Sequence, residues 1–160
     1  MDPVNHPLYD RFPPSKACSC TTCISFCRRP GWPLVEEMHL AIDAGLASHL
    51  MLEFSPNLSF GILAPAFSGN EGMFALTCFS NNYCTFFDQG RCALFGLPYR
   101  PLECRFCHHE RIGQGKACHL ALAHEWNTSK GKRLVHRWLR MMQLSYPDMP
   151  ALGLHLSRLI

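Results

Sequence analysis

Apolar residues recur at every fourth position in the segment that follows Pro33. The residues on this spacing are Leu34, Met38, Ile42, Leu46 and Leu50. The spacing predicts an amphipathic helix from Leu34 to about Glu53, interrupted at Gly45. Pro33 suits the first position of that helix, and the two carboxylates in its first turn complement the helix dipole.

Helical spacing returns in the C-terminal third of the chain. One helix is expected from near Lys116 to Trp126, and a second begins after Thr128 or Ser129, either of which can cap it. The apolar stripe of the second helix is Leu134, Val135, Trp138, Leu139 and Met142. Residues 150–160 have helical spacing as well.

Between these helices the pattern is that of strands and loops. Residues 59–64 and 73–79 are predicted to be short strands, with the turn-rich segment 65–72 between them. Residues 84–107 contain several glycines and prolines and are expected to form mostly loop and hairpin. The predicted fold class is therefore α+β, a small single domain in which a few helices and short strands alternate with irregular, cysteine-rich, metal-binding loops.

The organisation along the chain follows from the same pattern. Residues 1–17 are expected to be an irregular, proline-rich lead-in, residues 18–145 the cysteine-cluster metal-binding domain, and residues 146–160 a C-terminal tail. A chain of 160 residues with 48% hydrophobic residues can bury a core of its own. It contains no apolar run long enough to span a membrane, and its first residues lack the order of a secretory signal, so we expect a cytoplasmic protein.

The ten cysteines change this picture most. Disulfides are rare in a reducing cytoplasm, where clustered thiols are more often metal ligands or redox groups. One group is Cys18, Cys20, Cys23 and Cys27, and the other is Cys84, Cys92, Cys104 and Cys107. Short spacings such as Cys-x-x-Cys turn two sulfurs toward one ion, and two such loops that meet give the sulfur cage that zinc or an iron–sulfur cluster requires.

The cysteine pattern resembles a family of bacterial zinc- or iron-chelating cysteine-cluster domains named for an N-terminal CxxCxxCC. Cys20, Cys23 and Cys27 match three cysteines of that pattern, and Phe26 stands where the other would be. The second half of the resemblance lies in Cys84-Thr-Phe, in Cys92, and in Arg100-Pro-Leu-Glu-Cys104-Arg. The family has no assigned reaction, so the resemblance implies a metal site and leaves the function open.

On this resemblance the expected metal ligands are Cys20, Cys23, Cys27, Cys84, Cys92 and Cys104. The expected cofactor is zinc, with iron or an iron–sulfur cluster as the alternative. Six thiolates exceed what one tetrahedral ion binds, so either a second partial site exists or some sulfurs lie outside the ligand shell. Cys18, Cys107 or a histidine are candidates to complete the site, whereas Cys78 and Cys118 are expected to be small buried residues.

Histidines next to cysteines, as in Cys107-His108-His109 and Cys118-His119, can complete a mixed site, although a solvated or locally hydrogen-bonded histidine is the commoner case. The last predicted helix carries Lys132, Arg133, Arg137 and Arg140 opposite its apolar stripe. These four cations are candidates for a weak nucleic-acid contact, and an ordinary solvated helix face is the alternative. A protein partner stays open too.

Three functions are consistent with these observations. The first is a structural or accessory metal-binding protein with a thiolate-rich zinc or iron site. The second is an iron–sulfur redox protein or metal-dependent enzyme, which requires an open coordination position or a redox-active cluster. The third is a zinc-stabilised nucleic-acid or partner-binding module. No carboxylate pair, triad or nucleotide motif identifies a substrate, so whether the protein is an enzyme stays open.

Overall fold

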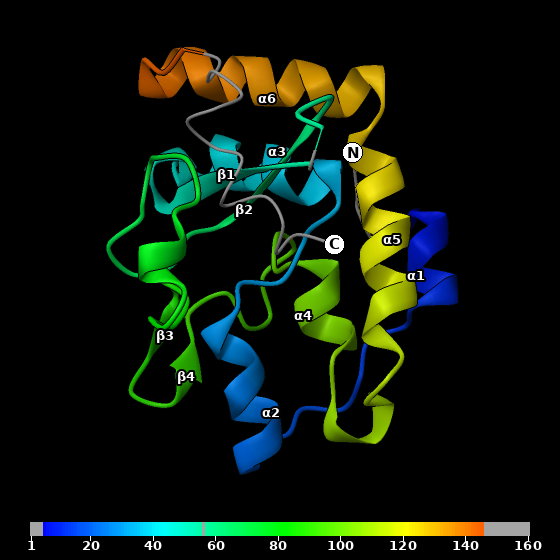
Figure 1. Cartoon of the computed structure of the whole chain (residues 1–160). Helices are drawn as coiled ribbons and strands as arrows, with labels where there is room; N and C mark the ends of the chain where they lie inside the picture. The colour runs from blue at the N-terminus through cyan, green and yellow to red at the C-terminus, as the bar shows by residue number, and fades with distance from the viewer. Residues whose placement is uncertain (1–4, 56, 146–160) are drawn as a thin grey trace.

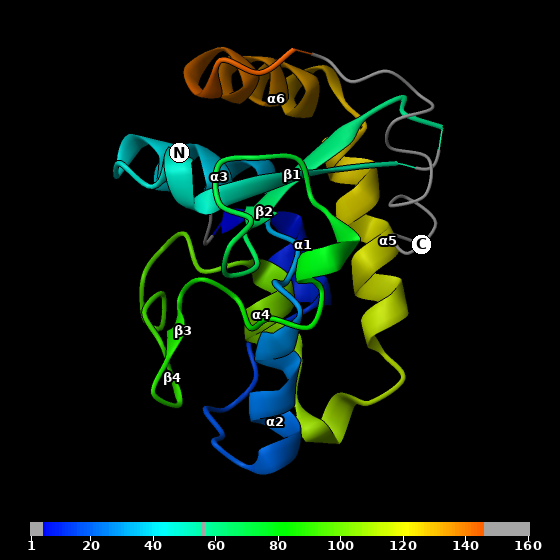
Figure 2. The same cartoon turned by 60° about the vertical axis from the view of Figure 1, so that its left-hand side comes forward.

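The computed structural model describes residues 5–55 and 57–145 and confirms a small α+β domain. The helices are α1 (Pro7–Arg11), α2 (Thr21–Ser25), α3 (Val35–Asp43), α4 (Leu102–Phe106), α5 (Gly115–Trp126) and α6 (Ser129–Met142). The strands are β1 (Leu50–Phe54), β2 (Gly61–Pro65), β3 (Phe87–Asp88) and β4 (Arg91–Cys92). In Figures 1 and 2, α6, α3 and the β1–β2 sheet occupy one end of the molecule, and α2 and the β3–β4 hairpin occupy the other.

The first of these ends, which we call the apolar half, contains the β1–β2 sheet. The two strands run antiparallel, with Leu52 opposite Leu63, and every residue of both strands is buried. Helices α3, α5 and α6 all contact β2. Trp32, Trp126 and Trp138 are among the largest fully buried side chains of this core.

The predicted helix from Leu34 to Glu53 is correct only in its first half. Helix α3 ends at Asp43, and Gly45 follows with a φ of +86°, a left-handed conformation that favours glycine and ends the helix. Residues Leu50–Phe54 form β1 instead. Both faces of this strand are buried and four of its five residues are apolar, so an apolar residue at every fourth position can be read from it by coincidence.

The prediction of a strand at residues 73–79 is wrong. This segment makes one isolated parallel bridge, between Leu52 and Phe74, and then forms a short 3-10 turn at Thr77–Phe79. The fully buried Asn70 side chain explains the difference. It donates to the Phe74 carbonyl and accepts from the Leu76 N–H, at 2.8 Å in both cases, and so satisfies backbone groups that a longer ladder would pair.

Both predicted C-terminal helices are confirmed. Helix α5 ends at Trp126, as expected, and Thr128 caps α6 by accepting the Gly131 N–H on its hydroxyl at 3.2 Å. The apolar stripe of α6 is buried, apart from the half-buried Met142 at its end. Residues 150–160 lie outside the described residues.

The predicted lead-in contains a short helix. Pro7 stands in the first turn of α1, where its missing N–H costs nothing, and the His6 side chain caps the helix by accepting from Leu8 N. Tyr9 and Phe12 are buried in the apolar core, so this segment contributes to the domain. No helix among the residues that the structure describes combines the length and apolar character needed to cross a membrane.

The other end of the molecule, which we call the cysteine half, comprises α2, α4, the β3–β4 hairpin and the loops between them (Figures 1 and 2). The buried carboxylate of Glu37, on α3, joins it to the apolar half. Its Oε1 accepts from Leu34 N at 2.7 Å and from Leu102 N, at the start of α4, at 2.9 Å. Its Oε2 accepts from the Tyr9 hydroxyl at 2.7 Å and lies 3.8 Å from the Arg105 guanidinium.

Candidate metal centre

Helix α2 places two thiols at one end of the molecule. Cys20 is the residue that caps α2, and its Sγ accepts the Cys23 N–H at 3.4 Å. This is the arrangement expected of a Cys-x-x-Cys loop, in which a backbone N–H points at a sulfur and stabilises its negative charge. Cys18 precedes the helix and lies in the same loop.

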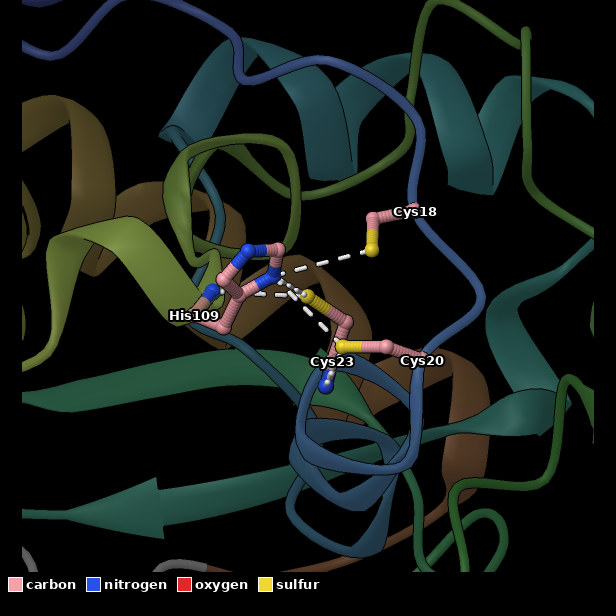
Figure 3. Close-up of side chains that lie close together, drawn as sticks. All are labelled: Cys18, Cys20, Cys23 and His109. Atoms are coloured by element: carbon pink, nitrogen blue, oxygen red, sulfur yellow. Dashed lines mark hydrogen bonds between the residues drawn. The ribbon is translucent and has the colours of Figure 1, made fainter.

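His109 comes to this loop from a segment far along the chain. Figure 3 shows its ring among the thiols of Cys18, Cys20 and Cys23. Its Nδ1 lies 3.6 Å from the Cys18 Sγ, 3.5 Å from the Cys20 Sγ and 3.3 Å from the Cys23 Sγ. The His109 N–H also donates to the Cys23 Sγ at 3.3 Å, which fixes the two segments together.

The four side chains form a Cys3His group that can hold a metal ion. Their ligand atoms all lie within 4.8 Å of one another. Tetrahedral zinc, with Zn–S near 2.3 Å and Zn–N near 2.0 Å, separates its sulfur and nitrogen ligands by about 3.5 Å and its sulfurs by about 3.8 Å. The observed nitrogen–sulfur distances of 3.3 to 3.6 Å match that geometry.

The two thiols of α2 differ in acidity. The hydrogen bond from the Cys23 N–H lowers the pKa of the exposed Cys20 thiol to about 7. Removal from water raises the pKa of Cys23 to about 11, against the opposing hydrogen bond from the His109 N–H. Near neutral pH, therefore, a metal ion meets one thiol that is already half ionised and one that must lose its proton on binding.

A carboxylate stands behind the imidazole. The second ring nitrogen of His109, Nε2, lies 4.0 Å from Glu110 Oε1. When Nδ1 binds a metal, Nε2 carries the proton and faces this carboxylate, which is the usual partner of a ligating histidine. Glu110 is largely exposed and is not one of the four close ligands.

The six predicted ligands are divided between two places. Cys20 and Cys23 belong to the Cys3His group, whereas Cys27, Cys84, Cys92 and Cys104 line a cavity of about 670 Å3 that Cys18 and Cys23 also line. The Cys84 N–H donates to the Cys27 carbonyl at 2.9 Å, Cys92 pairs with Phe87 across the hairpin, and Cys104 lies in α4. We call these four residues the cysteine tetrad.

Burial is the largest influence on the pKa values of Cys27, Cys84 and Cys104. It raises the pKa of Cys84 to about 12 and that of Cys27 and Cys104 above the ordinary thiol value. The neighbouring thiols of the tetrad raise these values further, while the Arg100 guanidinium opposes the rise at Cys27 and Cys104. The four thiols and Arg100 therefore share one electrostatic environment.

From the sequence, Cys18 is only a candidate to complete the site, and His109 is one of several candidate histidines. The signal for His109 was its position two residues after Cys107, but nothing in the sequence distinguishes it from His108. The structure does: His108 is buried and its Nδ1 accepts the Glu110 N–H at 3.1 Å, so only His109 faces the thiols. Cys107 lies outside the Cys3His group and is half-buried.

The remaining cysteines and His119 have other surroundings. Cys118 is fully buried, as predicted, whereas the prediction for Cys78 is wrong, because its side chain is exposed. His119 stacks on Trp32 and its Nδ1 lies 2.7 Å from Glu103 Oε2, an interaction that ties α5 to α4.

The basic face of α6 is partly neutralised by α3. Arg137 lies 3.3 Å from the Asp43 carboxylate, and Lys130 pairs with Glu36. Lys132, Arg133 and Arg140 are exposed. The nucleic-acid contact predicted for Lys132, Arg133, Arg137 and Arg140 stays a prediction.

Comparison with known proteins assigns the chain to no family. No family model matches the chain, and neither a curated protein nor a solved structure was found to be similar to it. The resemblance to the cysteine-cluster family therefore stays a prediction that rests on the spacing of the cysteines.

Proposed function

We propose that the protein binds one zinc ion through Cys18, Cys20, Cys23 and His109, and that this ion has a structural or accessory role. The observation that carries the proposal is the number of ligands. Three thiolates and one imidazole fill the four positions of tetrahedral zinc and leave none for a substrate or a water, which is typical of structural rather than catalytic zinc sites.

The position of the site supports the same role. Its thiols precede or begin α2, and its imidazole lies in the short turn His109–Arg111 that follows α4, 86 residues beyond Cys23. An ion at this point adds a tie between two segments that Ser15 also joins, by hydrogen bonds to the Arg105 and Phe106 carbonyls. Such a tie adds the free energy of metal binding to that of folding.

The test is metal analysis of the full chain, purified without oxygen, together with its visible spectrum after replacement of zinc by cobalt. We expect zinc in the purified protein and, with cobalt, the intense absorption bands of a tetrahedral thiolate site. His109→Ala and Cys23→Ser should remove the metal of this site, while Cys78→Ser, a change at an exposed thiol outside it, should not. Full zinc retention in both site variants would contradict the proposal.

A further inference from the structure

The lining of the cavity of about 670 Å3 carries an excess of positive charge. The cavity lies at the end of the molecule where Figures 1 and 2 show α2 and the β3–β4 hairpin. Among the described residues, its lining contains one carboxylate, that of Glu103, which lies 2.7 Å from His119 Nδ1. The cationic residues on the lining are Lys16, Arg28, Arg29, Arg91, Arg100 and Arg105. A concave surface of this charge attracts an anionic ligand.

Three of these cations are held by contacts within the fold. Arg105 donates to two main-chain carbonyls, at 2.8 and 2.9 Å. Arg29 lies 3.2 Å from a ring nitrogen of His119, and Arg100 donates to a main-chain carbonyl of α4 at 3.3 Å. These three side chains therefore help to fix the shape of the cavity wall.

The other three cations are free to meet a ligand. Lys16, Arg28 and Arg91 are all exposed. Arg28 donates from Nε to the Tyr83 hydroxyl at 3.4 Å, which leaves its terminal nitrogens available. Lys16 and Arg91 make no ion pair or side-chain hydrogen bond with any residue that the structure describes, although Asp88 stands opposite Arg91 in the hairpin. Exposed cations of this kind bind the phosphates of a polyanion.

Two exposed phenylalanines belong to the same lining. Phe26, in the turn that follows α2, is 36% exposed, and Phe95, in the turn that follows β4, is 58% exposed. The Arg100 guanidinium lies 4.8 Å from the centre of the Phe95 ring. Single exposed apolar residues are common, but two rings on one cationic cavity are the kind of platform on which nucleobases stack.

A single strand of nucleic acid has both of the features that this lining can recognise. It carries a phosphate at every nucleotide, and its unpaired bases expose flat aromatic faces. An acidic peptide would match the cations and not the rings. A duplex would also match the cations, but its bases are stacked on one another, so the two phenylalanines would add nothing to its binding.

We propose that this cavity binds a single-stranded segment of nucleic acid, with Lys16, Arg28 and Arg91 on its phosphates and Phe26 and Phe95 stacked on its bases. This inference goes beyond the proposed zinc site, since none of the five residues is a ligand of that site. The surface is also distinct from the basic face of α6.

The test is fluorescence anisotropy with the full chain, purified without oxygen. The probe is a labelled oligouridylate of about twelve nucleotides, a length within the site sizes of single-strand binding domains. We expect affinity to fall with salt, with a slope of about −2 in log affinity against log salt, because each of three phosphate contacts contributes about −0.7.

Two substitutions at exposed positions separate stacking from charge. Phe95→Ala should weaken binding roughly tenfold, because a stacked base is lost, and Phe95→Trp should restore it. Arg91→Gln should weaken binding and make the salt slope shallower by about 0.7. Met73→Ala, at an exposed apolar residue outside the cavity, is the control for the ring, and Lys132→Gln, on α6, is the control for the charge. Far-UV circular dichroism establishes that each variant is folded.

Four results would overturn the proposal. The first is no binding of the oligouridylate at low salt, and the second is unchanged binding in both Phe95→Ala and Arg91→Gln. The third is equal affinity for an RNA duplex of the same length. The fourth is competition by free uridine monophosphate at the same concentration as the strand, which would indicate a pocket for a small anion. Metal analysis of the same samples tests the zinc site separately, so failure of either proposal is seen without the other.

Discussion

The apolar half and the cysteine half of this molecule are organised by different forces. In the first, two strands buried on both faces and helices of nine to fourteen residues pack through tryptophan, leucine and methionine side chains. In the second, α2 and α4 have five residues each and the strands of the hairpin have two. Helices this short are not stable by themselves.

Side-chain exposure differs in the same way. The three tryptophans of the apolar half are at most 1% exposed, whereas Cys18 and Cys20 are exposed and Cys23, Cys27 and Cys92 are half-buried. The apolar half buries large side chains throughout, whereas the cysteine half buries few: Leu102 and Phe106 of α4 pack on the main core, and Cys84, Phe86 and Leu94 form a small separate cluster. We therefore expect the proposed zinc ion to contribute more to the stability of the cysteine half than to that of the apolar half.

Removal of metal is expected to produce the largest difference in stability between the two halves. After treatment with a strong chelator under reducing conditions, we expect amide protons of residues 18–28 and 107–111 to exchange freely, because structural zinc sites contribute on the order of 10 kcal/mol to folding. The amides of β1, β2 and α6 should stay protected. Hydrogen exchange measured by mass spectrometry checks this, and equal loss of protection in both halves would refute the distinction.

Trp138→Ala tests the apolar half directly. Trp138 is fully buried and donates from Nε1 to the Ala47 carbonyl at 2.8 Å, so the change leaves a large cavity and an unpaired carbonyl. We expect the free energy of unfolding to fall by about 4 kcal/mol. Urea unfolding of the metal-loaded protein measures it, with Lys132→Ala, on the exposed face of the same helix, as the control. A loss below about 1 kcal/mol would mean that α6 contributes little to this core.

Glu37→Ala tests the connection between the halves. The substitution leaves the N–H groups of Leu34 and Leu102 and the Tyr9 hydroxyl without their acceptor in a fully buried place. We expect a loss of about 3 kcal/mol in the free energy of unfolding, together with weaker protection of α4. Glu37→Gln keeps an oxygen for the two backbone donors and should cost less. Equal effects of the two substitutions would argue against these hydrogen bonds as the cause.

The affinity of the Cys3His group for zinc should depend on pH in a defined way. A thiol must lose its proton to bind metal, so affinity rises with pH. The pKa of Cys23 is raised to about 11 and that of Cys20 lowered to about 7, so these two thiols together should cost about a hundredfold in affinity from pH 6 to pH 5. Above pH 7 Cys20 is mostly ionised, so it contributes little more to the rise of zinc affinity with pH. Competition with a zinc chelator of known affinity measures the slope, and an affinity independent of pH would exclude thiolate ligation.

Much of the apolar half could be predicted from the sequence, because its helices are long enough to show their periodicity. Helix α6 combines a capping threonine with an unbroken apolar stripe, and both signals are local. The secondary-structure predictions are wrong where contacts with residues elsewhere in the chain determine the local structure. Residues Leu50–Phe54 became a strand because β2 pairs with them, and residues 73–79 did not because Asn70 occupies their backbone groups.

The sequence predicts that cysteines, with a histidine as one candidate, form the candidate site. It does not predict which of these residues come together. The spacing of Cys20 and Cys23 shows that they face one point, since one turn of backbone separates them. That His109 joins them, while Cys27 turns toward Cys84, depends on contacts between segments far apart along the chain. Sequence spacing carries no information about such contacts.

The distance along the chain between Cys23 and His109 has a consequence for biosynthesis. A ribosome adding about 5–20 residues per second needs roughly 4–17 seconds to make the intervening residues. During that interval Cys18, Cys20 and Cys23 have emerged without their imidazole, and the buried partners of Cys27 have not yet been made. The newly made thiols are therefore open to oxidation, and the zinc site proposed above can be completed only when translation has passed residue 109.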